Sequence, residues 1–407
     1  NVMPNSGNPY QQKIDMRGYG IEDGYQNIVV TLNGRRLNNI DMQPQLLSSI
    51  PVASIERIEI IKGSGSVAQG DGAMAGVINI VTRDMHGVDL SIAGGSHSYG
   101  QGSIAAGIKQ DLFAIQVLAD KSQTDGQRKK DVNGKKADSD SENLSADLKI
   151  FPVEGLELRL GKDRTRIDTR YGSPITKREF NKKPSQPGLA FPGGPLKSYT
   201  MLELKTDTNR LGASYQLNEM LSFNLDHAVE KKESEFAGPG SQPSKYDYRS
   251  TDFSSQLNLD QLTLVAGVQL FDGERKAFGD KTTKDNKAVY LQGQYSLGNT
   301  LFSAGVRREK VEYDYKAIGT RLKDDHKLNA WDLGINHQYN EQLSVFANIS
   351  YGFQAPDIDR FFAFLPPSYN PVFNGFMKPA KNKTLNIGLN HVTESNQLKV
   401  TTFYSRL

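Results

Sequence analysis

The sequence has no cysteine, no long apolar run and almost no net charge. The absence of cysteine from 407 residues fits an oxidising or cell-surface compartment that avoids stray thiols. No apolar run approaches the roughly 18 residues that a membrane-spanning helix requires. The net charge of +3 is too small to indicate a nucleic-acid partner, because basic residues alternate with acidic ones, as between Arg308 and Lys316. Only 37 % of the residues are hydrophobic, which argues against the thick core of a soluble enzyme.

Glycine and aromatic residues, by contrast, are plentiful: the chain has 38 glycines, 17 tyrosines and 18 phenylalanines. This balance suits many strands that each show one apolar and one polar face. From residue 87 onward such alternation dominates; Leu156, Leu158 and Leu160, for example, are separated by charged residues. A period of two indicates strands with unlike faces, in either a soluble sandwich or a membrane barrel.

The connections between these strands favour the barrel. Very short turns, such as residues 152–155 and 260–261, alternate with longer polar loops. We expect the loops at roughly residues 123–140, 166–197, 235–248, 275–285, 315–326 and 354–381. Short turns on one rim and long loops on the other are typical of an outer-membrane β-barrel. The pattern holds only if residues 198–217 form one long tilted strand rather than two.

The expected fold is therefore membrane all-β, an antiparallel transmembrane β-barrel with about fifteen strands in this sequence. An odd number of strands does not close a bacterial single-chain barrel, and an intact barrel of about 22 strands would need about seven more. The sequence also opens without a signal peptide. We expect a fragment that lacks its processed N-terminus and its last strands.

The residues before position 86 differ in character, because short apolar strands, glycine turns and one charged strand replace the regular alternation. The stretches Ile14–Gly20, Asn27–Asn39 and Ile50–Asp84 follow one another in the order and spacing of a known domain. This region resembles the plug domain of TonB-dependent outer-membrane transporters. Lys62 and Gln69 depart mildly from that family's pattern, which usually has arginine and tyrosine there.

Two later stretches, Tyr351–Phe362 and Asn370–Asn390, are similar to the barrel signatures of the same family. The resemblance implies an N-terminal α+β plug domain at residues 1–85, inside the lumen of a barrel at residues 86–407. It does not cover the energy-coupling segment, which lies outside this sequence.

The resemblance also implies where a ligand would bind, namely at plug loops and one barrel loop on the long-loop side. The candidate contacts are Tyr25, Gln26, Asp41 and Gln43 on the plug and Phe361, Phe362, Tyr369 and Phe373 on the barrel. The candidate polar links between plug and barrel are Arg17, Glu56, Arg57, Glu59 and Lys62. The alternatives are aromatic residues that only pack loops or form the membrane-interface girdle, and an ordinary solvated charged strand.

A phosphate cradle would be another explanation for the glycine-rich stretch at residues 63–76. Such a cradle needs a Gly-Lys-Ser/Thr motif opening onto a helix, whereas residues 77–82 read as a strand. We interpret these glycines as positions where a compact plug turns tightly and passes close to the barrel wall. The sequence also has no GxSxG or HExxH motif, so we expect no enzyme, no catalytic residue and no metal site.

By resemblance, the protein is expected in the outer membrane of a Gram-negative bacterium, where it would import a scarce metal chelate with energy from the TonB complex. A ferric siderophore is the first candidate ligand and no resident cofactor is expected. Cobalamin is the second; haem is disfavoured because the stretch 353–382 has no histidine to serve as an axial ligand. Other expected partners are membrane lipid and lipopolysaccharide, which the lysine-rich loops would meet. A passive porin and a surface binding or signalling receptor are the rival functions.

Overall fold

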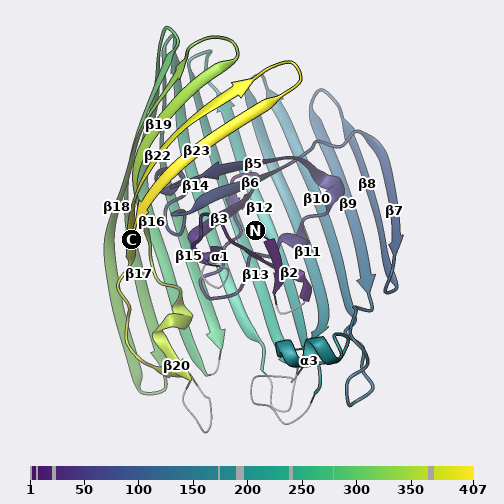
Figure 1. The fold of residues 1–407 in the computed structure, drawn as a ribbon. Helices are drawn as coiled ribbons and strands as arrows, with labels where there is room; N and C mark the ends of the chain where they lie inside the picture. The colour runs from purple at the N-terminus through teal and green to yellow at the C-terminus, as the bar shows by residue number, and fades with distance from the viewer. Residues whose placement is uncertain are drawn as a thin grey trace.

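The computed structural model describes residues 2–5, 8–20, 24–172, 175–188, 197–237, 242–277, 279–364 and 371–407. A large curved sheet of 15 strands wraps around a small N-terminal unit, whose first residues lie within the curve (Figure 1). The strand number and the antiparallel all-β wall are as predicted. The described part of the sheet has two edges, β7 and β23.

Each wall strand pairs antiparallel with its neighbours in the chain, so the wall is a simple meander. Its strands are β7 (Gly87–Gly95), β8 (Tyr99–Lys109), β9 (Phe113–Thr124), β10 (Ser139–Val153), β11 (Leu156–Tyr171), β12 (Thr200–Gln216), β13 (Leu221–Ala237), β14 (Ser244–Leu259), β15 (Leu262–Ala277), β16 (Asp280–Leu297), β17 (Thr300–Ala317), β18 (Thr320–Gln338), β19 (Leu343–Gln354), β22 (Ala380–Val392) and β23 (Gln397–Arg406). The prediction of one unbroken strand over residues 198–217 is confirmed by β12.

The two faces of the wall differ as the alternation predicts. In β17, Arg307, Glu309 and Val311 point inward and are buried, while Val306 and Arg308, which alternate with them, point outward and are exposed. Among the described residues, no helix has both the length and the apolar character to cross a membrane.

Two of the expected long loops are wrong. Residues 275–285 and 315–326 belong to long hairpins in which Ala277 pairs with Asp280, and Ala317 with Thr320. These segments resemble loops in the sequence because their outward side chains change from apolar to charged along the strand. In β16, Val289 and Leu291 are apolar, whereas Lys287, which is nearer the hairpin turn, is charged. A strand of 18 residues exceeds the 9–11 that cross a bilayer, and its excess carries water-facing charge.

Two of the remaining long loops carry short elements of their own. Residues 172–199 contain the helix α3 (Lys177–Lys182), which begins with a reciprocal capping box between Thr176 and Glu179. The loop between β19 and β22 contains the 3₁₀ turn η3 (Ile358–Phe361) and a small hairpin of β20 (Phe362–Phe364) and β21 (Pro371–Phe373). Figure 1 places α3 and β20 on the same rim, opposite the tight turns.

The N-terminal unit, called the plug below, has a sheet of order β4-β3-β6-β5 in which only β3 and β6 run parallel. Its elements are β1 (Val2–Asn5), β2 (Asn8–Ile14), α1 (Gly24–Asn27), β3 (Ile28–Leu32), β4 (Arg35–Arg36), η1 (Leu47–Ser49), η2 (Val52–Ser54), β5 (Ile55–Lys62), α2 (Ser66–Gln69) and β6 (Gly76–Thr82). Ile28, Val30 and Ile80 form its own apolar core. The one-turn helix α2 is not evident in the sequence.

The glycine-rich stretch behaves as interpreted. Gly70 has a φ of 67°, and a Cβ there would collide with the side chains of Glu309 and Arg307 on the wall. At Gly76 a Cβ would collide with the carbonyl oxygen of Ile61. The stretch leads into strand β6, so the chain turns tightly and passes close to the wall.

Candidate functional site

Two segments meet at the long-loop end of the plug: the apex loop, residues 38–45, and the outer segment, residues 355–362. The amide of Ile358 donates to the carbonyl oxygen of Ile40 at 2.9 Å. At the start of the outer segment, the amide of Ala355 donates to the Asp71 carboxylate at 2.6 Å. The outer segment is therefore bonded to the plug at two separate points.

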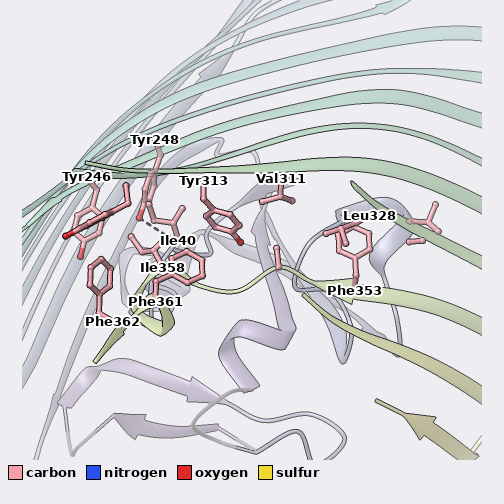
Figure 2. Close-up of a cluster of buried hydrophobic side chains, with 14 residues drawn as sticks. Ile40, Tyr246, Tyr248, Val311, Tyr313, Leu328, Phe353, Ile358, Phe361 and Phe362 are labelled. Atoms are coloured by element: carbon pink, nitrogen blue, oxygen red, sulfur yellow. Dashed lines mark hydrogen bonds between the residues drawn. The ribbon is translucent and has the colours of Figure 1, made fainter. Parts of the chain in front are cut away.

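An aromatic cluster joins these segments to the wall. Figure 2 shows Tyr246, Tyr248 and Tyr313 on the wall strands, facing Ile40, Ile358, Phe361 and Phe362. Phe361 lies edge-on to Tyr313 with ring centroids 5.0 Å apart. The Tyr313 hydroxyl donates to the carbonyl oxygen of Pro356 at 2.7 Å, so this ring is both packed and hydrogen-bonded.

A buried ion cluster lies beside the aromatic residues. Arg275 of β15 pairs with Asp41 of the apex loop, at 3.4 Å, and with Asp359 of η3. Asp41 also accepts a 2.7 Å hydrogen bond from the hydroxyl of Tyr246. Burial raises the pKa of Asp359; the Asp41 carboxylate adds to the rise and the Arg275 guanidinium opposes it.

A second ion cluster holds the turn after α2 against the wall. Asp71 is 3 % exposed and pairs with Lys284 of β16 at 2.7 Å. Burial by itself raises the pKa of Asp71, but the Lys284 ammonium and the Arg36 guanidinium outweigh it, so the pKa lies below its ordinary value. Asp71 is therefore ionised in the folded protein at neutral pH.

Below the apex loop, a cavity of about 660 Å³ separates the plug from the wall. Charged side chains from both sides line it, among them Arg35, Arg36 and Asp71 of the plug and Asp226 and Arg307 of the wall. Its volume is within the range of small-molecule sites, and its paired charges suit a water-filled space.

The structure brings together most of the predicted plug contacts. The Gln26 side chain donates to the carbonyl oxygen of Asp41 at 2.6 Å, and the amide of Gln43 donates to the Asp41 carboxylate at 3.2 Å. Asp41 itself is only 1 % exposed. Tyr25 lies in α1, and its side chain is outside the described residues.

The predicted barrel contacts lie next to these plug residues. Phe361 is fully buried, Phe362 is 9 % exposed, and the half-buried Phe373 stacks on Tyr315 with centroids 5.0 Å apart. Tyr369 lies outside the described residues. The alternative of loop-packing aromatic residues thus describes Phe361 and Phe362 in this conformation.

Of the predicted polar links between plug and wall, the described contacts show the one made by Arg17, and the others stay predictions. The Arg17 guanidinium lies over the ring of Phe403 on β23, and it also donates to the Lys62 carbonyl oxygen within the plug at 2.9 Å. Arg57 pairs instead with Glu56 and Glu59, within the same exposed strand. Strand β5 lies at the edge of the plug sheet, and its residues from Glu56 to Lys62 are exposed. Among the described contacts, Lys62 contributes its carbonyl oxygen and no side-chain link.

Other links between plug and wall were not predicted from the sequence. Arg35 pairs with Glu230 at 3.0 Å, and the guanidinium of Arg307 donates to the carbonyl oxygen of Val67 at 3.3 Å. On the other side of the plug, Asn382 donates to the hydroxyl of Tyr19 at 2.6 Å. One signal was available, because charged and amide residues at inward positions of a barrel strand need a partner inside the lumen.

Comparison with known families agrees with this architecture. Residues 1–77 match the TonB-dependent Receptor Plug Domain, and residues 82–407 match the TonB dependent receptor-like beta-barrel. The chain belongs to the TonB-dependent receptor family. Members of this family are Gram-negative outer-membrane receptors and transporters, not enzymes, which confirms the expected location and class.

Relatives of this TonB-dependent receptor have different ligands. The vitamin B12 transporter BtuB of Photobacterium profundum is 24 % identical over 395 residues, which cover 94 % of this chain and 59 % of the relative. The ferric yersiniabactin uptake receptor FyuA from Yersinia pestis has a TM-score of 0.76 at 16 % identity, covering 100 % of this chain and 67 % of that one. The unliganded ferric citrate transporter FecA has a TM-score of 0.78 at 15 % identity, covering 100 % of this chain and 65 % of that one.

These likenesses establish the family and the fold and leave the ligand undecided. The chain spans about three fifths of the length of the vitamin B12 transporter that it matches. Identities near 15 % to the solved structures show a shared fold alone.

Proposed function

We propose that this chain is the plug, residues 1–85, and part of the barrel, residues 86–407, of an energy-coupled importer of a metal chelate. The observation that carries the proposal is a plug that lies within the curve of the wall, with its apex loop bonded to the outer segment. A passive porin would instead need an open lumen. The outward apolar residues would face lipid, and the lysine-rich loops would face lipopolysaccharide phosphates.

A ferric siderophore is the first candidate ligand. The mouth is lined by aromatic rings with a few polar groups, which suits a large and partly apolar chelate. Cobalamin is the second candidate, and the 24 % identity to a vitamin B12 transporter over nearly the whole chain favours it. Haem is a poorer fit, because no histidine occurs in residues 353–382.

The accessible side chains at the mouth would make the first contacts. Gln43 and Phe373 are half-buried, and Met42 beside them is 40 % exposed. Asp41 and Phe361 are covered in this conformation, so they would touch a ligand only after the outer segment moves. Tyr25, Gln26, Phe362 and Tyr369 remain candidate contacts.

Transport past the plug would require work from outside the outer membrane, which has no nucleotide supply. A partner of the TonB type at the inner membrane would supply it by pulling on a segment before the plug, as the family resemblance implies. During transport, part of the plug would then move into the cavity beside Arg36 and Asp71.

The test is uptake by cells that carry or lack the full-length gene. Iron-starved cells would be offered a panel of ferric siderophores, and cobalamin-dependent cells would be offered cyanocobalamin. We expect growth rescue by one ligand, lost on deletion of the gene or of the TonB partner. Large open conductance of the purified protein in planar bilayers would indicate the porin instead. Failure of every iron and cobalt chelate to bind would contradict the proposal.

A further inference from the structure

One buried guanidinium connects three segments that are far apart in the sequence. Arg275 extends inward from β15, and its side chain is 6 % exposed. It contacts Asp41 of the apex loop, which is 1 % exposed, and Asp359 of the outer segment, which is 25 % exposed. Wall, plug and outer loop therefore meet at a single side chain.

The chemistry of this contact suits arginine. Both carboxylates lie against the same guanidinium nitrogen, Nη1, whose two N–H groups can serve them at once. Without it, Asp41 and Asp359 would be like charges in a poorly hydrated site and would repel each other. Asp359 also accepts from the amide of Met42 at 3.0 Å, so the outer segment contacts the apex loop directly as well.

The contact has two halves, the ion pair of Arg275 with Asp41 and the ion pair of Arg275 with Asp359, and they differ in burial. The Asp41 half is held further by the Tyr246 hydroxyl and is almost fully buried. The Asp359 half lies on a short 3₁₀ turn and is partly open to water. Water can therefore replace the Asp359 half more readily than the Asp41 half.

We propose that Arg275 is the positioning residue of the mouth. It holds the outer segment down on the apex loop through Asp359, while it keeps the apex loop against the wall through Asp41. A ligand that lifts the outer segment breaks the Asp359 half first and leaves the plug held to β15. The inference rests on the proposed function in treating this mouth as the ligand entrance, and its test needs no ligand.

The absence of cysteine from the chain makes the test direct. Spin labels at Ile318→Cys, on the exposed tip of the β17–β18 hairpin, and at Val372→Cys, on β21, report the distance from wall to outer loop. A second pair at Ile318→Cys and Met42→Cys reports the distance from wall to apex loop. Both distances are measured by pulsed electron–electron double resonance on the full-length protein. The backgrounds compared are wild type, Arg275→Gln, Asp359→Asn and Arg249→Gln.

Arg249 is the matched control, because it lies on the neighbouring strand β14 and is 61 % exposed. We expect both distances to lose their single narrow distribution in Arg275→Gln. In Asp359→Asn only the outer-loop distance should broaden, and in Arg249→Gln neither should. Arg275→Lys should restore the apex-loop distance better than the outer-loop distance.

Narrow, wild-type distributions in Arg275→Gln would overturn the proposal. If that variant does not give a folded, SDS-resistant barrel, Asp359→Asn decides alone: a broadened outer-loop distance supports the proposal and an unchanged one overturns it. Failure of every chelate in the uptake panel would count against the proposed function and leave this result standing.

Discussion

Replacing Asp71 with asparagine tests whether ion pairs hold the plug turn in the barrel. Asp71→Asn keeps the size of the side chain and an acceptor for the amide of Ala355, but it leaves the buried Lys284 without its counter-ion. Breaking a buried pair from one side costs about 3–5 kcal/mol. Because asparagine retains an acceptor for the Ala355 amide, we expect the lower end of this range, about 3 kcal/mol. This corresponds to about a hundredfold rise in the population of the undocked turn.

Hydrogen–deuterium exchange of peptides covering residues 63–77 and 353–362 would measure this change. Protection should fall in both, because the Asp71 carboxylate connects them. Asp89→Asn is the matched control: its partner is Arg83, the pair is about half exposed, and less than about 1 kcal/mol should be lost. Unchanged protection in Asp71→Asn, or equal loss in the control, would refute the reasoning.

The same residue predicts a dependence on pH. Because the folded pKa of Asp71 lies below its ordinary value of 3.8, the pair stabilises the docked turn fully above that value. The stabilisation is lost as the pH falls through the folded pKa, when the carboxylate takes up a proton. Exchange protection of residues 63–77 should be constant from pH 7 to pH 5 and fall below pH 4 in the wild type. In Asp71→Asn this acid-dependent step should be absent.

Three further changes test other parts of the interface. Gly70→Ala should add about 1–2 kcal/mol of backbone strain and a collision with Glu309. The plug should therefore unfold at a lower urea concentration than in the control Gly134→Ala, which changes an open loop position with a φ of 73°. Arg35→Gln removes the pair with Glu230 and should cost about 1.5 kcal/mol, again read as the urea midpoint of the plug. Phe361→Ala should cost about 3–5 kcal/mol and expose residues 355–362 to protease, whereas Phe180→Ala, at a 57 % exposed ring, should not.

Most of the architecture could be predicted from the sequence because barrel strands obey a strict period of two. The leucines of β11 and the single long strand β12 follow from that alternation and from the position of the loops. The same rule failed at residues 275–285 and 315–326. There the outward residues change from apolar to charged while the strand continues beyond the bilayer, so the pattern loses its contrast and resembles a loop.

The site was predictable only in part. The family motifs placed the apex loop and the outer segment at the same mouth, and the structure joins them through Asp41 and Asp359. No local pattern shows that Arg275 lies between them, because its two partners are more than 80 and 230 residues away in the chain. The sequence likewise does not show that the charged strand β5 lies at the edge of the plug sheet, because the sheet order depends on distant strand pairings.

The nature of the contacts bears on how a barrel can hold a plug firmly and still release it. The apolar core of the plug, with Ile28 and Ile80, is separate from the residues that contact the wall. Many of the wall contacts are instead ion pairs and hydrogen bonds, such as Arg35 with Glu230 and Asp71 with Lys284. Charges recover their hydration when they separate, so such pairs fix geometry while adding little net stability. A plug held by apolar burial alone would be stabilised in proportion to its contact area with the wall, and it would resist withdrawal. The aromatic mouth is the exception, and the same reasoning makes it the part of the interface that resists separation most.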